Sequence, residues 1–335
     1  MDLITQGLLG ATLAQTAAPR NEVRVATLAG FAAGLLPDAD ALIRSDSDPL
    51  LFLEYHRHFS HALVFVPLGA LIATLLLWPV LRLRLPLARI YLYTFLGYAL
   101  AGVLDACTSY GTHLLWPFSD ARIAWSIVSI VDPVFSLLLV AALAVGLLRT
   151  TPVAARVGAL LAAGYLVLGL VQHERAEDLV ERLADRRGHV AERVVVKPSF
   201  GNILLWRSLY VSDGTIQADA LRLPPWGEAR IYPGDTAALL DLDGDVAWAE
   251  PGSRARADLE RFAFFSDGML IAHPRDPALI GDARYAMLPG SLRPLWGIRF
   301  EDPDPAQGAE WVTDRQMTPA ERQRFADMLL GRGRH

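Results

Sequence analysis

The chain has 335 residues, of which 53% are apolar, and its formal net charge is −5 at neutral pH. The length is enough for two domains, the negative charge gives no basic footprint for nucleic acid, and the single cysteine excludes an internal disulfide. Residues 1–171 contain only ten basic and ten acidic residues, whereas residues 172–335 contain 21 and 26, so the two halves differ in character.

Two short apolar segments, residues 3–18 and 25–37, begin the chain. Both are rich in glycine and alanine, and both are short for a lone membrane span, which needs about 20 apolar residues. Small residues allow helices to approach one another closely. The sequence therefore predicts a helical hairpin buried against the helices that follow.

Four longer apolar segments come next, at residues 62–81, 87–104, 123–148 and 153–171. Backbone amides in lipid must find their hydrogen-bond partners within the segment, so membrane spans of this length are helices. Residues 1–171 are thus predicted to form a multi-span α-helical membrane domain.

Basic residues gather in alternate loops of this domain. Seven of its ten arginines lie in three links: Arg20, Arg24, Arg82, Arg84, Arg89, Arg149 and Arg156. By the positive-inside rule these links face the cytoplasm. Both termini and the loops at 38–61 and 105–122 then face outward, which predicts a multi-pass protein of the bacterial inner membrane with a periplasmic C-terminal domain.

Candidate metal ligands collect at the predicted outer face. Asp38 and Asp40 end the second helix, His56 and His61 precede the third, and Asp105 ends the fourth. Taken singly, an acid at a helix end is ordinarily a cap or a solvated charge. Histidine and carboxylate together are the usual ligands of Zn²⁺, and carboxylate-rich sites also suit Mn²⁺ or Mg²⁺.

Three further residues bear on this site. Asp132 lies about nine residues into the apolar segment 123–148, where an ionised carboxylate costs at least ~2.5 kcal/mol and needs a partner. Arg57 has the planar fork that binds carboxylates and phosphates. On a helix His58 and His61 share a face, so spacing by itself favours that pair over His56 with His61.

The second half differs in composition. Residues 172–192 are charged and helix-prone, and they predict a solvated helical linker. Residues 193–335 contain β-rich runs separated by turn clusters, among them residues 261–273, and these indicate a mostly antiparallel sheet. A capping box at 318–321, with proline at the first helical position, predicts a terminal helix. The expected fold is therefore the membrane domain followed by a soluble α+β domain.

Five segments in series resemble one family, the bacterial membrane-bound metal-dependent hydrolases, also described as LexA-controlled inner-membrane hydrolases. They are MDLITQGLLGATLAQ, LPDAD, HRHFSHAL, LDACTSYGTHLLWPFSD and SIVDPVFSLLL, in matching order and spacing through residues 1–140. The resemblance implies a relation to the zinc phospholipase C and P1 nuclease group, and hence a zinc-dependent phosphoester hydrolase. The positions it carries over are Asp38, Asp40, His56, Arg57, His61, Asp105, Thr108, Tyr110 and Asp132.

The family pattern also modifies the interpretation of the histidines. It stresses His56 and His61 rather than His58, and we follow it because the segment before residue 61 need not be helical. Many relatives have histidine where this chain has Gln6, and again where it has Ala101, four residues before the aspartate of the fourth helix. Losing an imidazole reduces the ligands for metal and puts activity in question.

These observations lead to a hypothesis with an open alternative. The expected metal ligands are Asp40, His56, His61 and Asp105, and the expected catalytic residues are Asp38, Arg57 and Asp132. The metal is a divalent cation, zinc by resemblance. Because the site is at headgroup depth, its substrate would be a lipid or lipid-linked phosphoester among the membrane lipids. The alternative is a non-catalytic scaffold or sensor with a structural polar or metal cluster. A transporter ranks last, because only one charge was placed within a span.

Overall fold

The computed structural model describes residues 1–332 and divides the chain into two compact units. The first unit comprises Met1–Ile43, Tyr55–Val171 and Phe200–Asn202. The second comprises Arg44–Glu54, Gln172–Ser199 and the chain from Ile203 onward. The units divide between Val171 and Gln172, which lie within one continuous helix, Val153–Arg186. This helix, and not a loop, joins the two units there.

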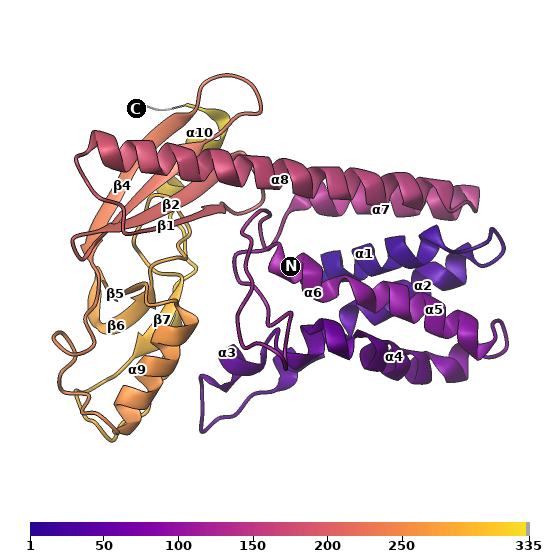
Figure 1. Cartoon of the computed structure of the whole chain (residues 1–335), viewed down its shortest axis with the longest axis horizontal. Coiled ribbons are helices and arrows are strands. Elements are labelled where there is room, and N and C mark those ends of the chain that lie inside the picture. The colour runs from indigo at the N-terminus through magenta and orange to yellow at the C-terminus, as the bar shows by residue number, and fades with distance from the viewer. Residues whose placement is uncertain (333–335) are drawn as a thin grey trace. The chain divides into compact units, whose positions relative to one another are not determined.

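The first unit is helical. Its helices are α1 (Leu3–Thr16), α2 (Val23–Leu35), α4 (Val66–Leu81), α5 (Leu87–Ala99), α6 (Ala101–Ala106), α7 (Pro133–Arg149) and the first part of α8 (Val153–Arg186). Three short 3₁₀ segments continue or precede them: η1 (Pro37–Leu42), η2 (Phe59–His61) and η3 (Leu63–Phe65). Helices α1, α2, α4 and α5 lie side by side (Figure 1).

Within residues 1–332, four helical segments are long and apolar enough to cross a membrane: Val23–Leu42, Leu63–Leu81, Leu87–Ala106 and Val153–Arg186. Three of them correspond to the spans predicted at 62–81, 87–104 and 153–171, and the first of these begins one residue later than predicted. The fourth includes the second short helix, which η1 lengthens to 20 residues. The expected hairpin is also confirmed, since α1 packs along α2 and also contacts α5 and α7.

The span predicted at residues 123–148 was wrong in its first ten residues. These residues form no helix, and α7 begins only at Pro133 and has 17 residues. Proline is favoured at the first position of a helix, and it disfavours helical backbone in the residue before it. Asp132 is therefore not inside a span. It is the N-cap, and its side chain accepts hydrogen bonds from the backbone amides of Val134 and Phe135.

Three glycines allow the central helices of this unit to cross closely. A Cβ atom at Gly30 of α2 would lie 2.4 Å from the carbonyl oxygen of Gly10 in α1. A Cβ at Gly97 of α5 would lie 2.5 Å from the carbonyl oxygen of Gly30. Neither position has room for any side chain, as expected of membrane helices that pack through small residues.

The second unit contains two four-stranded antiparallel sheets, each with its strands in chain order. The first consists of β1 (Arg193–Pro198), β2 (Leu205–Ser212), β3 (Thr215–Arg222) and β4 (Arg230–Ala238). The second consists of β5 (Leu270–His273), β6 (Asp276–Asp282), β7 (Trp296–Arg299) and β8 (Glu310–Thr313). The antiparallel α+β character expected of this half is thereby confirmed, with two sheets in place of one.

The C-terminal part of α8 belongs to the core of this second unit. Ala176, Val180 and Ala184, spaced four residues apart, are buried against Trp206 and Tyr210 of β2. The prediction of a solvated linker over residues 172–192 was wrong for this face. The prediction rested on the many charged residues of this segment, but these residues lie on the exposed face of an amphipathic helix whose other face is buried.

Three helices complete the second unit. They are α9 (Arg254–Phe265), α10 (Pro319–Leu330) and most of the short α3 (Leu51–Tyr55). The strand expected at 261–273 was wrong in its first part, because residues 261–265 end α9, whose apolar residues Ala255, Leu259 and Phe262 follow helical spacing. The terminal helix is confirmed, with the capping box formed between Thr318 and Glu321.

Candidate metal centre

Three short segments bring the candidate ligands together at one end of the helical unit. Asp38 and Asp40 lie on η1, His61 ends η2, and Asp105 lies on α6. A Cβ atom at Gly102 would lie 2.0 Å from the carbonyl oxygen of His61, so only glycine allows α6 to approach η2 this closely. The chain thus holds residues more than 60 positions apart within bonding reach.

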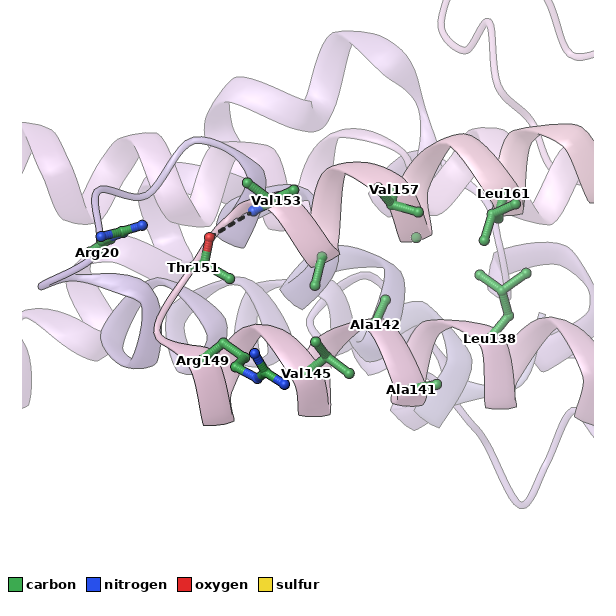
Figure 2. A pocket seen from close by; sticks show the side chains of 12 residues that line it. Arg20, Leu138, Ala141, Ala142, Val145, Arg149, Thr151, Val153, Val157 and Leu161 are labelled. Atoms are coloured by element: carbon green, nitrogen blue, oxygen red, sulfur yellow. Dashed lines mark hydrogen bonds between the residues drawn. The ribbon is translucent and has the colours of Figure 1, made fainter.

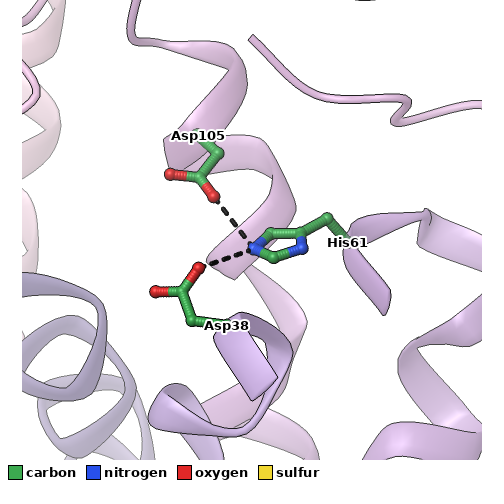
Figure 3. A group of neighbouring side chains, drawn as sticks. All are labelled: Asp38, His61 and Asp105. Carbon is green, nitrogen blue, oxygen red and sulfur yellow. Dashed lines mark ion pairs between the residues drawn. The ribbon is translucent and has the colours of Figure 1, made fainter. Parts of the chain in front are cut away.

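His61 directs one ring nitrogen toward two carboxylates (Figure 3). Its Nε2 lies 3.0 Å from Asp105 Oδ2 and 3.3 Å from Asp38 Oδ1. Although these atoms are close and buried, neither Nε2 nor Asp38 Oδ1 has a well-directed hydrogen bond to any residue among 1–332. Two ligands about 2.1 Å from a tetrahedral Zn²⁺ lie about 3.4 Å apart. The spacing and the unsatisfied atoms therefore fit a shared cation.

Asp40 orients this imidazole from the other side. Its Oδ2 accepts hydrogen bonds from His61 Nδ1 at 3.1 Å, from the Ser60 hydroxyl and from the Arg57 backbone amide at 2.9 Å. Its Oδ1 accepts from His56 Nδ1 at 2.9 Å. A carboxylate on Nδ1 leaves Nε2 of the neutral ring as the electron-pair donor, which is how metal-binding histidines are usually held.

A second group of ligand atoms adjoins the first. One ligand atom each from Asp38, Asp40 and His56 lies within 4.8 Å of the others, as also holds for Asp38, His61 and Asp105. Asp38 is common to both groups. In two-metal hydrolytic sites the cations are about 3.5–4 Å apart, and the two adjoining groups would supply ligands for such a pair of cations.

Arg57 forms an ion pair with Asp105. Its backbone is left-handed, with φ of 62°, and its side chain is buried. Nε lies 3.3 Å from Asp105 Oδ2, while the terminal nitrogens donate to the Thr108 hydroxyl at 3.1 Å and to the Met1 carbonyl at 3.0 Å. The predicted contact of Arg57 with a substrate anion stays a prediction, because both terminal nitrogens already have acceptors.

Asp105 has further donors around its two oxygens. Gln6 Nε2 donates to Oδ2 at 2.9 Å, and the α-amino group of Met1 pairs with Oδ1. Gln6 thus contacts the cluster from the position where relatives often have histidine. Ala101, the other departure from the family pattern, is buried and offers no donor atom.

The electrostatics of His61 agree with a cation at this point. Burial by itself lowers the pKa of His61, but the neighbouring carboxylates of Asp105, Asp38 and Asp40 outweigh it and raise this pKa to about 10. A proton on the imidazole therefore supplies the positive charge that the surrounding carboxylates favour. A divalent cation on Nε2 would replace that proton.

The loop after α6 holds the Arg57 segment in place. The carbonyl oxygen of Arg57 accepts from the Thr112 hydroxyl at 2.9 Å and from the His113 amide at 3.1 Å. His113 Nδ1 donates to the Asp120 carbonyl at 3.0 Å. Burial, assisted by Arg122 and His58, lowers the pKa of His113 to about 4, so this ring is neutral at physiological pH.

The structure places Asp132 among protein donors. In addition to its two capping bonds, its Oδ2 accepts from the Tyr165 hydroxyl at 2.8 Å. The predicted catalytic role of Asp132 stays a prediction, and its observed contacts are those of a helix cap. Sequence reasoning missed Ser60 as a donor to Asp40, since nothing in the spacing of HRHFSH distinguishes this hydroxyl from an ordinary helix cap.

Comparison with known proteins covers the helical half. The model of a family described as YdjM inner membrane protein matches residues 1–176, which include every candidate ligand above. Among curated proteins, the chain is 28% identical over 123 residues to "Uncharacterized protein YfhP" of Bacillus subtilis (strain 168). This match covers 37% of the chain and 36% of the relative, so the chain spans about a third of that protein's length. No solved structure matches the chain.

Proposed function

The chain belongs to the YdjM inner membrane protein family, and from this premise we propose that it is a metal-dependent hydrolase of the inner membrane. Its substrate class is a phosphoester or lipid-linked phosphoester at the outer leaflet. The C-terminal unit is periplasmic in this proposal, because the arginine-rich links are assigned to the cytoplasm by the positive-inside rule. The relation to the zinc phospholipase C and P1 nuclease group is part of the same hypothesis.

One observation carries the proposal: the buried Nε2 of His61 faces a carboxylate oxygen of Asp38 and one of Asp105, and among residues 1–332 neither Nε2 nor Asp38 Oδ1 has a well-directed hydrogen bond. Asp38, His61 and Asp105 are the proposed ligands of one cation, and Asp38 with Asp40 and His56 the ligands of a second. Three protein ligands leave a coordination position open for water or substrate, which is the pattern of catalytic rather than structural zinc sites.

The protein groups have distinct parts in this mechanism. A divalent cation, when bound, lowers the pKa of a water molecule and polarises the phosphoester. Asp40 fixes the tautomer and direction of His61 through Nδ1. Arg57 holds Asp105 in place and adds a positive charge behind it. Asp38 is the most exposed of the three first ligands, with 11% of its side chain accessible, and substrate would approach on its side.

Burial supports a second candidate function, a scaffold or sensor with a structural metal. The side chains of His61, Asp40 and Asp105 are 0% exposed, and only Asp38 and His56 reach the surface. A cation enclosed to this degree can hold the fold together without turning over a substrate. Metal binding with no phosphoesterase activity is the result that this alternative expects.

The first test is elemental analysis of protein purified from membranes without chelators. We expect about one or two equivalents of a divalent metal per chain, and loss of most of it in His61→Ala. His58→Ala is the matched control, because it removes an imidazole three residues away that belongs to neither ligand group. Unchanged metal content in His61→Ala would end the proposal of a metal centre at these residues.

The second test concerns hydrolysis. Purified protein with bound metal is assayed against bis(p-nitrophenyl) phosphate and against phospholipid vesicles, with p-nitrophenol and diacylglycerol release as the respective readouts. The hydrolase proposal expects activity that disappears in both His61→Ala and Asp38→Asn but not in His58→Ala. Full metal occupancy together with no turnover of either substrate would favour the scaffold or sensor.

A further inference from the structure

A groove runs between α7 and α8 at the end of the helical unit opposite to the metal ligands. Its volume is about 750 Å³. Leu138 and Leu161 lie at one end of it, and Arg20 and Arg149 lie at the other (Figure 2). Its walls between these ends are the apolar side chains of residues such as Val145 and Val157.

The groove exists because the helices that form it present small residues to each other. A Cβ atom at Gly158 of α8 would lie only 2.3 Å from the Cβ of Ala142 in α7. At this contact the helices are close, and larger valine and leucine side chains of both helices line the groove around it. The lining of the groove is apolar except for Arg20, Arg149 and Thr151.

Three guanidinium groups at the basic end have no acidic partner within the described part of the chain. Among residues 1–332, Arg20 and Arg149 form no ion pair, and Arg156 donates its Nε to the carbonyl oxygen of Thr16. Arg20 and Arg156 also line an adjoining hollow of about 550 Å³. Arg89, by contrast, is paired with Glu22 at 2.9 Å. The three guanidinium groups are exposed, so they are accessible to an anion from outside the chain.

We propose that this groove binds an anionic glycerophospholipid, with an acyl chain between α7 and α8 and the phosphate against Arg20, Arg149 and Arg156. Arginine is suited to phosphate because its fork offers parallel N–H donors. Basic pockets between membrane helices are the usual sites for acidic lipid headgroups. A ligand that is apolar at one end and anionic at the other matches both the apolar walls and the basic end of the groove.

The length of the groove fits one leaflet. From Leu138 to Arg149, α7 advances by eleven residues, which is about 16 Å at 1.5 Å per residue. The hydrocarbon of one leaflet is about 15 Å thick, half of the total of about 30 Å. A phosphate at Arg149 therefore places the acyl chain along the apolar wall as far as Leu138. This inference is independent of the proposed hydrolase, which concerns the other end of the unit.

The test compares two lipids with identical acyl chains. Purified full-length protein is titrated with phosphatidylglycerol or phosphatidylcholine, and bound lipid is counted by native mass spectrometry while the unfolding temperature is followed. We expect phosphatidylglycerol to bind at least about tenfold more tightly and to raise the unfolding temperature. Free glycerol 3-phosphate is a third arm, and it should leave both readouts unchanged because it lacks an acyl chain. Equal binding of both lipids would overturn the proposal.

Variants assign the binding to this groove. The combined change Arg20→Gln, Arg149→Gln and Arg156→Gln should abolish the preference for phosphatidylglycerol. A matched control, Arg24→Gln with Arg82→Gln and Arg84→Gln, removes three other exposed arginines from links of the same predicted side.

The apolar part needs its own variant. Ala141→Trp places a large side chain at an exposed position on the groove wall. It should reduce phosphatidylglycerol binding while the arginines remain. A preference for phosphatidylglycerol that survives the groove triple variant, or falls equally in the control triple, would contradict this site. So would unchanged binding in Ala141→Trp.

Discussion

At the scale of single residues, Asp40 determines how the candidate centre is arranged. It accepts hydrogen bonds from four groups, and the bond from His61 Nδ1 leaves Nε2 to face Asp38 and Asp105. Asp40 was expected as a direct metal ligand and Asp38 as a catalytic residue. Asp38 belongs to both ligand groups, and Asp40, a proposed ligand in the second group, also positions His61 through Nδ1.

The change Asp40→Asn tests this positioning role. The amide keeps the shape of the side chain, but its NH₂ group cannot accept the bonds that the lost oxygen accepted. We expect metal affinity to fall by about 10- to 100-fold, measured by competition with a chromophoric chelator. Ser60→Ala, which removes a single donor to the same carboxylate, should cost less. Wild-type affinity in Asp40→Asn would show that Asp40 does not position the ligand.

His113 predicts a dependence of stability on pH. Its pKa is lowered to about 4 in the folded protein, whereas an unfolded histidine titrates near 6.5. Between these values the unfolded chain binds more protons, so this residue's contribution to stability is complete above pH 6.5 and is lost as the pH falls toward 4.

The matched variant is His113→Asn, whose side-chain amide can still donate to the Asp120 carbonyl but does not titrate. Unfolding temperature measured from pH 7.5 to 4.5 in detergent should fall less steeply for the variant than for the wild type. Parallel curves for the two proteins would mean that another group is responsible.

At the scale of elements, small residues determine how the helices of the first unit meet. Gly10, Gly30 and Gly97 place backbone against backbone at the crossing of α1, α2 and α5. The hydrophobic effect does not drive membrane helices together, because lipid tails are as apolar as the helix surfaces. Close van der Waals packing therefore supplies much of the free energy of helix association. Residue composition predicted the hairpin, but not which glycines lie at the crossing.

Gly30→Val should therefore be severely destabilising. Its side chain would meet Gly10 O at 2.4 Å and Ala14 Cβ at 2.5 Å, and overpacking of this kind costs about 1–3 kcal/mol or more. Gly164→Val is the control, because a Cβ there has nothing within 4 Å. Thermal unfolding in detergent should separate the two variants by several degrees. A Gly30→Val protein as stable as Gly164→Val would disprove the observed crossing.

At the scale of the whole molecule, the chain forms two compact units, one of apolar helices and one with two antiparallel sheets. The helical unit carries the candidate metal centre at one end and the basic groove at the other. The second unit has two antiparallel sheets and includes the C-terminal part of α8. The proposed function and the proposed lipid site require that these two ends face opposite sides of the membrane.

Single-cysteine labelling tests this sidedness. The native Cys107 is buried, so background reaction should be low. Leu83→Cys, between α4 and α5, and Trp226→Cys, in the second unit, replace residues that are equally exposed, at 88%. In cells with a permeabilised outer membrane, a membrane-impermeant maleimide should label position 226 at once and position 83 only after lysis. The reverse pattern would place the C-terminal unit in the cytoplasm.

The apolar segments of the chain by themselves determined that it has membrane helices, because insertion into lipid depends on the summed apolarity of about 20 consecutive residues. Apolarity and charge along the chain gave wrong predictions at two places, the start of α7 and the C-terminal part of α8. The helix α7 begins at Pro133, and Asp132 is its N-cap. In α8 the many charged residues predicted a solvated helix, although Ala176 and Val180 on the other face are buried.

The sequence also determined which residue types are available for a metal, since histidines and acids recur at one predicted face. Only the tertiary structure decided which of them meet. Asp38, His61 and Asp105 converge because short 3₁₀ turns, a left-handed Arg57 and the close approach at Gly102 direct their side chains. Periodicity along a chain reports which face of an element is buried. It carries no information on which distant residue lies opposite, because that depends on backbone directions in turns that have no period.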